Sequence, residues 1–117
     1  MPEKTVEKSA HVDFETLLAK FGGDGDMVRQ LIKIFLEDMP GAVALIEQRL
    51  AAGDAGALQE AAHSFKGAVG NFEARPAWDL ARELETLASE GRLDRADQAF
   101  NRLKAELEQL SRELGAF

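Results

Sequence analysis

Residues 58–72, LQEAAHSFKGAVGNF, determine how the whole chain is interpreted. Their apolar side chains recur at intervals of three and four residues, the spacing of one face of an α-helix: Leu58, Ala61, Ala62, Phe65, Val69 and Phe72. Because a helix advances about 100° per residue, His63 lies about 160° away from Phe65 around the helix axis. The pattern therefore predicts a helix that buries its apolar side and presents His63 to solvent.

The face around His63 has an unusual composition. Lys66 and Gly67 follow the histidine by three and four residues, so all three share one face. The other members of this face are Gln59, Glu60 and Gly70. A glycine inside a helix costs roughly 1 kcal/mol relative to alanine, and a helix tolerates this where another molecule approaches its backbone. Gly67 is thus a candidate docking position. The alternative is that the glycine lets a neighbouring helix pack closely. This alternative applies more to Gly70 than to Gly67.

An exposed histidine beside a lysine favours phosphoryl chemistry. A neutral imidazole is a competent nucleophile near pH 7, and it can attack an acyl phosphate to form a phosphoramidate. Phosphoryl transfer requires in-line positioning and neutralisation of the negative charge on the phosphoryl oxygens. Lys66 can supply one positive charge there. The alternative is that His63 and Lys66 are ordinary solvated side chains.

The composition restricts the chain to one acidic domain without thiol chemistry. Its 117 residues fit a single domain, and a hydrophobic content of 45% is enough for a packed core. The formal net charge of −7 argues against nucleic acid and anionic membranes as main partners. Residues 1–12 are polar and are expected to form a flexible leader ahead of a domain over residues 13–117. With no signal sequence or membrane-length apolar run, a cytoplasmic location is expected.

Capping residues divide residues 13–117 into one short helix, ending near Lys20, and four longer helices. An aspartate side chain can accept hydrogen bonds from the first backbone N–H groups of a helix, and four are suitably placed: Asp13, Asp24 (or Gly25 as the opening residue), Asp54 and Asp94. Gly53 and Gly91 are expected just past helix ends. Pro76 is expected at the first position of a helix.

The second predicted helix contains a proline. Pro40 removes one backbone hydrogen bond, so the apolar pattern from Met27 to Leu50 predicts either one helix kinked near Pro40 or two stacked pieces. Trp78 continues the apolar pattern of the fourth helix and is expected in the core or partly exposed. No strand is predicted. The chain is therefore expected to form an all-α, up-down antiparallel four-helix bundle with a short extra N-terminal helix.

Residues 63–72, HSFKGAVGNF, resemble the histidine-containing phosphotransfer (HPt) domain family, whose pattern is His, any residue, an aliphatic or aromatic residue, Lys and Gly, then small residues. The resemblance extends over nearly the whole chain from about Asp13. It implies a four-helix bundle in which His63 accepts the phosphoryl group, Lys66 supports it and Gly67 leaves room for a receiver domain. Glu73 departs from the family pattern, since many members have glycine there. We expect it to affect the helix end or the docking charge and not the chemistry.

The resemblance also implies a function and partners. HPt domains relay phosphoryl groups between aspartates of response-regulator receiver domains without binding ATP, so a phosphocarrier is expected and not an enzyme. The expected partners are receiver domains and a hybrid histidine kinase. No cofactor is expected, because the receiver site supplies the Mg²⁺. Docking is expected on an exposed apolar patch of the His63 helix and the preceding long helix. A monomer suits such a shuttle, and Met1 with its short leader favours a free-standing protein.

Two other functions are weighed against the relay. The first is an HPt-like docking module that regulates a kinase or receiver without turnover, which the intact set of His63, Lys66 and Gly67 disfavours. The second is a di-iron site, because Glu60 and His63 have the Glu-x-x-His spacing of such bundles. A di-iron site needs two such motifs, and His11 in the leader is the only other histidine. No metal site is therefore expected.

Overall fold

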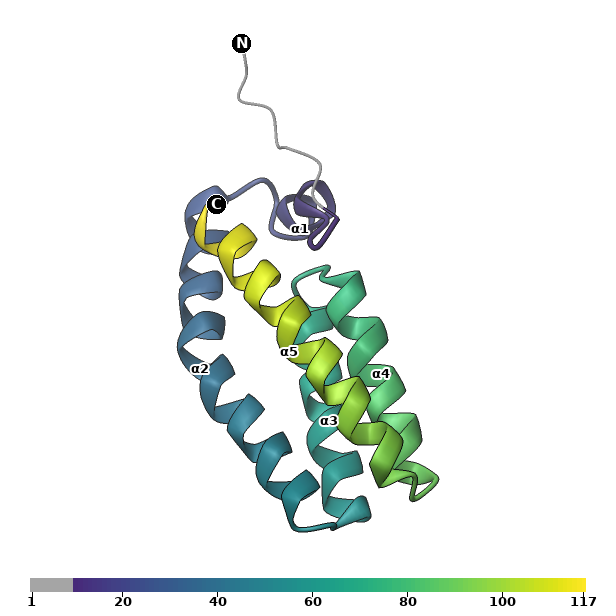
Figure 1. The fold of residues 1–117 in the computed structure, drawn as a ribbon. Coiled ribbons are helices and arrows are strands. Elements are labelled where there is room, and N and C mark those ends of the chain that lie inside the picture. The colour runs from purple at the N-terminus through teal and green to yellow at the C-terminus, as the bar shows by residue number, and fades with distance from the viewer. Residues whose placement is uncertain (1–9) are drawn as a thin grey trace.

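The computed structural model describes residues 10–117, which form five helices and no strand. The helices are α1 (Phe14–Lys20), α2 (Gly25–Ala51), α3 (Ala55–Gly70), α4 (Arg75–Ser89) and α5 (Leu93–Gly115). The four long helices run up and down, with α3 and α5 each packed between α2 and α4 (Figure 1). Helix α1 lies at the end of the bundle where α2 begins and α3 ends. The predicted all-α bundle with a short extra helix is confirmed.

Three of the four predicted aspartate caps are confirmed. Oδ1 of Asp13, Asp24 and Asp54 each accepts a hydrogen bond of 3.1 Å from the backbone N–H three residues on. The prediction for Asp94 is wrong, because α5 begins at Leu93 and Asp94 lies in its first turn. The N-cap of α5 is Arg92, whose N–H closes the end of α4 with a 2.9 Å hydrogen bond to the Leu87 carbonyl. The connection between α4 and α5 thus consists of residues 90–92 only, and Asp94 falls inside α5.

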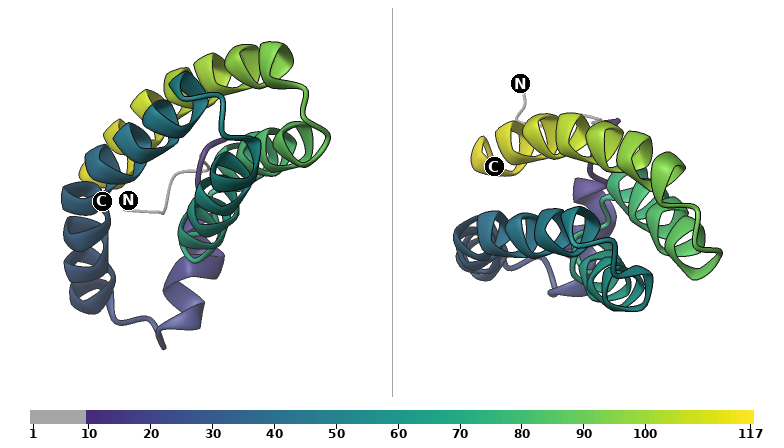
Figure 2. Two further views of the ribbon diagram at one scale, coloured as in Figure 1. Left: turned by 90° about the horizontal axis from the view of Figure 1, so that it is seen from below. Right: turned by 60° about the horizontal axis from the view of Figure 1, so that its bottom comes forward.

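Helix α2 passes through Pro40 without a break, so the alternative of two stacked pieces is wrong. Its axis bends along its length, as Figure 2 shows. Pro40 is exposed, and helices commonly curve where a proline removes a backbone hydrogen bond.

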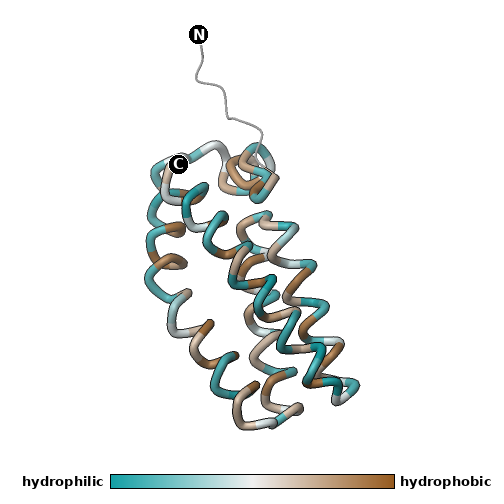
Figure 3. The backbone as a smooth tube through the Cα atoms, viewed as in Figure 1, coloured by the Kyte–Doolittle hydropathy of each residue, from teal (hydrophilic) through white to brown (hydrophobic). Residues whose placement is uncertain are grey.

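The core is built from the apolar stripes of the helices. Figure 3 shows apolar and polar residues alternating along each long helix. Helix α3 contributes the residues that its periodicity predicts, since Leu58, Phe65 and Val69 are at most 3% exposed. Trp78 is partly buried against the edge of this core. Within residues 10–117 no polar or charged side chain is buried, so every site in this part of the chain lies at its surface.

Most of the predicted leader, residues 1–9, lies outside the described residues. Of its last residues, Val12 is 2% exposed and belongs to the core. Nδ1 of His11 lies 2.7 Å from Oε2 of Glu106 on α5. The packed part of the chain therefore starts ahead of Asp13, the boundary that the sequence predicts.

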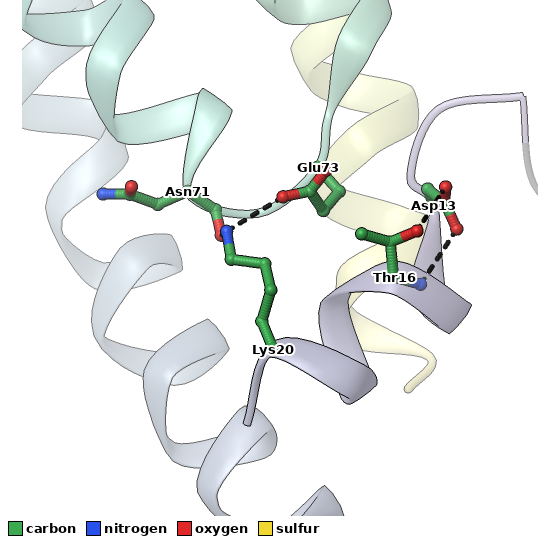
Figure 4. Close-up of polar contacts among 5 residues, drawn as sticks. All are labelled: Asp13, Thr16, Lys20, Asn71 and Glu73. Atoms are coloured by element: carbon green, nitrogen blue, oxygen red, sulfur yellow. Dashed lines mark hydrogen bonds and ion pairs between the residues drawn. The ribbon is translucent and has the colours of Figure 1, made fainter. Parts of the chain in front are cut away.

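Helix α1 and its N-cap are held to the connection between α3 and α4 by hydrogen bonds and an ion pair (Figure 4). Lys20 Nζ donates to the Asn71 carbonyl at 3.1 Å and pairs with Glu73 Oε2 at 2.9 Å. The N–H of Asp13 donates to the Glu73 carbonyl at 3.0 Å. Glu73, three residues after the end of α3, has a left-handed backbone conformation with a φ of 53°. The first left-handed residues after α1, α2 and α4 are instead glycines, with φ of 64°, 68° and 71°: Gly22, Gly53 and Gly91.

Candidate functional site

His63 lies in the middle of α3 on the solvent side of the helix. Its side chain is 66% exposed, whereas Phe65, two residues on, is 3% exposed. The apolar stripe of α3 faces α2 and α4, which leaves the opposite side free of neighbouring helices. The orientation predicted from helical periodicity is therefore the one that the structure has.

A carboxylate on α4 joins His63 to Lys66. Oε2 of Glu85 lies 2.8 Å from Nδ1 of His63, and Oε1 of the same residue lies 2.8 Å from Nζ of Lys66. The side chains of Glu85 and Lys66 are 19% and 22% exposed, so both are largely shielded beside the more exposed imidazole. The structure thus confirms that His63 and Lys66 lie close together and adds a third member from another helix.

Sequence reasoning missed Glu85. It lies 22 residues from His63 on a different helix, and their contact depends on how α3 and α4 pack. The sequence contains one local indication of this contact, which is the position of Glu85 at the border of an apolar stripe: it directly follows buried Leu84 and lies four residues after buried Ala81. A glutamate at the border of an apolar stripe points along the interface with the next helix, where it can meet a cation.

The electrostatics of the site fix which imidazole nitrogen carries the proton. The pKa of Glu85 is lowered below its ordinary value of 4.5, mainly by the hydrogen bond from Lys66. Burial raises this pKa, and the hydrogen bond with His63 lowers it further. Glu85 is therefore a carboxylate at neutral pH and can only accept hydrogen bonds. It follows that Nδ1 of His63 is the donor, and in the neutral ring Nε2 carries the free lone pair.

The glycines of the His63 face have different surroundings. A Cβ atom added to Gly67 would meet no atom within 4 Å, so the space beside this residue is open. A Cβ atom added to Gly70 would lie 3.1 Å from Cδ1 of Trp78, so this glycine lets the indole lie against α3. On the same face Gln59 is partly buried and Glu60 is exposed. Of the two glycines, only Gly67 leaves a free approach to the helix backbone.

An apolar groove runs between α2 and α3, next to the His63 face. It consists of two adjoining hollows of about 320 and 270 Å³ that share Ala42, Phe65 and Ala68 in their lining. Ile34 and Leu45, both on α2, are 54% and 39% exposed, which is unusual for side chains of this size. The sequence predicted an exposed apolar patch on these two helices, and the groove has that position and character.

Two kinds of site or segment are not found in the described part of the chain. Among residues 10–117, no three His, Cys, Asp or Glu side chains are grouped so that they could hold a metal ion. No helix in the same residues has the length and apolar character needed to cross a membrane.

Comparisons with known proteins agree with this geometry. Among solved structures, the chain is similar to the crystal structure of histidine-containing phosphotransfer protein B (HptB) from Pseudomonas aeruginosa PAO1. The two chains are 28% identical, with a TM-score of 0.86 over 93% of this chain and 95% of that chain. No curated protein matches the sequence. Residues 30–113, which include all of α3 and α4, match the model of the Hpt domain. The chain therefore belongs to the Hpt domain family, the histidine phosphotransfer domains of two-component phosphorelays.

Proposed function

We propose that Nε2 of His63 accepts a phosphoryl group from the phospho-aspartate of one response-regulator receiver domain and passes it to an aspartate of another. One observation carries this proposal: the imidazole is 66% exposed while its Nδ1 is held 2.8 Å from Glu85. The nucleophilic nitrogen is thus turned toward solvent and the ring has a fixed orientation.

The transfer needs no proton from the protein. The lone pair of Nε2 attacks phosphorus, a P–N bond forms, and the P–O bond to the aspartyl carboxylate breaks, so that the carboxylate leaves as an anion. The imidazole ring gains positive charge in this step. Glu85 accepts the hydrogen bond from Nδ1 and stabilises that charge, as carboxylates do for histidines in other active sites. The reverse attack by the second aspartate restores neutral His63.

Lys66 supplies positive charge at the site. Its Nζ lies one helical turn from His63 and 2.8 Å from Glu85. In the phosphorylated protein we expect the ammonium group to move from Glu85 toward the phosphoryl oxygens, which carry the greater negative charge. Positioned cations of this kind act by electrostatic stabilisation of the transferring group.

A receiver domain would approach over Gly67 and the groove between α2 and α3. The space at Gly67 is open, and the exposed side chains of Ile34 and Leu45 flank the groove. An apolar centre with a polar rim is typical of transient protein interfaces. Gln59 and Glu60 remain candidates for the edge of this contact, whereas Gly70, which the sequence also offered for docking, is covered by Trp78.

The test is transfer of label from a receiver domain. The protein is mixed with receivers that carry ³²P on their aspartate, in the presence of Mg²⁺. We expect label that is stable in base and labile in acid, full label in His11→Gln as the matched control, and none in His63→Gln. Undiminished label in His63→Gln, or none on the wild type with any receiver, would contradict the proposal. Receiver binding without label would favour a regulatory docking module.

A further inference from the structure

A second surface next to His63 is built around Trp78 on α4. Cations from two helices lie near its indole: Nζ of Lys66 at 5.6 Å from the ring centroid, and Cζ of Arg75 and Arg82 at 4.9 and 5.7 Å. We call these four residues the Trp78 surface. The chain as a whole has a formal net charge of −7, so three cations around its single tryptophan contrast with the general charge of the molecule.

The position of the indole is fixed by α3. Cδ1 and Nε1 of Trp78 would lie 3.1 and 3.5 Å from a Cβ atom at residue 70, which only glycine leaves free. Glycine within a helix is less favourable than alanine. The close contact at Gly70 therefore seats the indole against the backbone of α3 and gives the cations a rigid platform. Each cation–aromatic contact of an exposed side chain adds modestly to stability.

One of the three cations is not neutralised by a nearby acid. Nε of Arg75 pairs with Asp79 at 3.0 Å, and Lys66 pairs with Glu85 at 2.8 Å. Arg82 is exposed and has no ion pair among residues 10–117. Its guanidinium group is planar and can bind a carboxylate through two parallel hydrogen bonds.

The Trp78 surface is continuous with the phosphoacceptor site. Glu85 contacts both His63 and Lys66, and Lys66 also lies over Trp78. This surface lies on the α4 side of α3, whereas the apolar groove lies on the α2 side. A partner that reaches Nε2 of His63 therefore meets an apolar groove on one side and a guanidinium group on the other.

We propose that the Trp78 surface binds the acidic rim of a receiver domain's phosphorylation site, with Arg82 pairing with a receiver carboxylate. The partner's identity rests on the proposed function, since a site that forms phospho-aspartate and holds Mg²⁺ must be rich in carboxylates. The positive charge of the Trp78 surface by itself requires only that the partner be an acidic protein. Nucleic acid fits less well, because 21 acidic residues against 14 basic ones would repel it.

The test uses Trp78 as its own reporter. The chain contains one tryptophan and no tyrosine, so its emission reports only on this surface. His63→Gln, which cannot be phosphorylated, is titrated with a set of receiver domains whose own tryptophans are replaced by phenylalanine. We expect the emission of Trp78 to change on binding, and Arg82→Glu to raise Kd about tenfold and to weaken its salt dependence. Arg95→Glu, the same charge change on α5, should leave Kd unaltered.

The outcomes separate this inference from the proposed function. An unchanged Kd in Arg82→Glu, or no change in Trp78 emission with any receiver, would overturn the docking surface. Arg82-dependent binding together with absence of label on wild-type protein would support the surface and refute the phosphotransfer. Because the side chain of Arg82 is exposed, the variant should remain folded, with its thermal unfolding midpoint lowered only by the loss of the contact with Trp78.

Discussion

Two histidine–glutamate pairs in this molecule have nearly the same geometry but different surroundings. Nδ1 of His63 is 2.8 Å from Glu85, and Nδ1 of His11 is 2.7 Å from Glu106. The side chain of His63 is 66% exposed and that of His11 is 24% exposed. The first pair bridges α3 and α4 at the surface. The second holds the segment ahead of α1 against α5.

Both histidines have a carboxylate on Nδ1, so it is their surroundings that distinguish them. Around His63 the carboxylate also holds Lys66, the space over Gly67 is open and the apolar groove lies alongside. A cation, an open space and an apolar groove therefore coincide at the pair formed by His63. Three predictions test this distinction.

The largest effect is expected from closing the open space beside His63. In Gly67→Leu the new side chain occupies the approach to Nε2, and we expect phosphoryl transfer to fall about a hundredfold, since small misplacements of reacting groups have effects of this size. The free energy of unfolding should be unchanged or rise by up to about 1 kcal/mol, because leucine favours helix over glycine. The measurements are the rate of label transfer and urea denaturation. An unaltered rate in a folded variant would show that partners do not approach over Gly67.

A smaller effect is expected from removing each carboxylate in turn. Glu85→Ala releases Nδ1 of His63 and Lys66 together, and we expect the transfer rate to fall by about tenfold, as for other groups that orient a histidine. Glu106→Ala should leave this rate unchanged and lower the free energy of unfolding by about 1 kcal/mol, the size of one hydrogen bond. Single-turnover transfer and denaturation of both variants provide the comparison. Equal rate losses in the two variants would remove the distinction between the pairs.

The smallest effect is the pH dependence of stability at Glu85. Its pKa is lowered in the folded protein, chiefly by the hydrogen bond from Lys66. On acidification, Glu85 is therefore protonated at a higher pH in the unfolded chain than in the folded protein. The stabilisation by the Glu85 carboxylate is present above the ordinary pKa of 4.5 and is lost as pH falls through the lowered folded-state pKa. The difference in unfolding free energy between wild type and Glu85→Ala should therefore be larger at about pH 7 than at about pH 3. A difference that grows on acidification would have the wrong sign.

The fold could be predicted because its signals are local. The cap at Asp54 and the apolar spacing of Leu58, Phe65 and Val69 each act within one helix, and the structure confirms them. The cap prediction at Asp94 failed because the preceding helix end determines where α5 begins. Arg92 serves both helices, and no residue preference within α5 alone reveals this.

The site could be predicted only in part. The spacing of His63, Lys66 and Gly67 within one helix gives their shared face directly. Glu85 and Trp78 reach the same surface from α4, and their positions depend on the rotation of α4 about its own axis. Sequence spacing places Glu85 at the border of the apolar stripe of α4, but it does not show which neighbouring helix that border faces. For the same reason it could not separate Gly67, which is open, from Gly70, which is covered by Trp78.

The left-handed conformation of Glu73 has a consequence for the local dynamics of α3. A residue with a Cβ atom costs roughly 1–2 kcal/mol in this conformation, and here the contacts to Lys20 and Asp13 offset that strain. Those contacts come from α1 and its cap, which lie ahead of the family-matched residues 30–113. Detachment of α1 would leave the strain uncompensated, so we expect the last turn of α3 and α1 to open as one cooperative unit. Hydrogen exchange at the end of the helix that carries His63 should therefore depend on a segment far away in sequence.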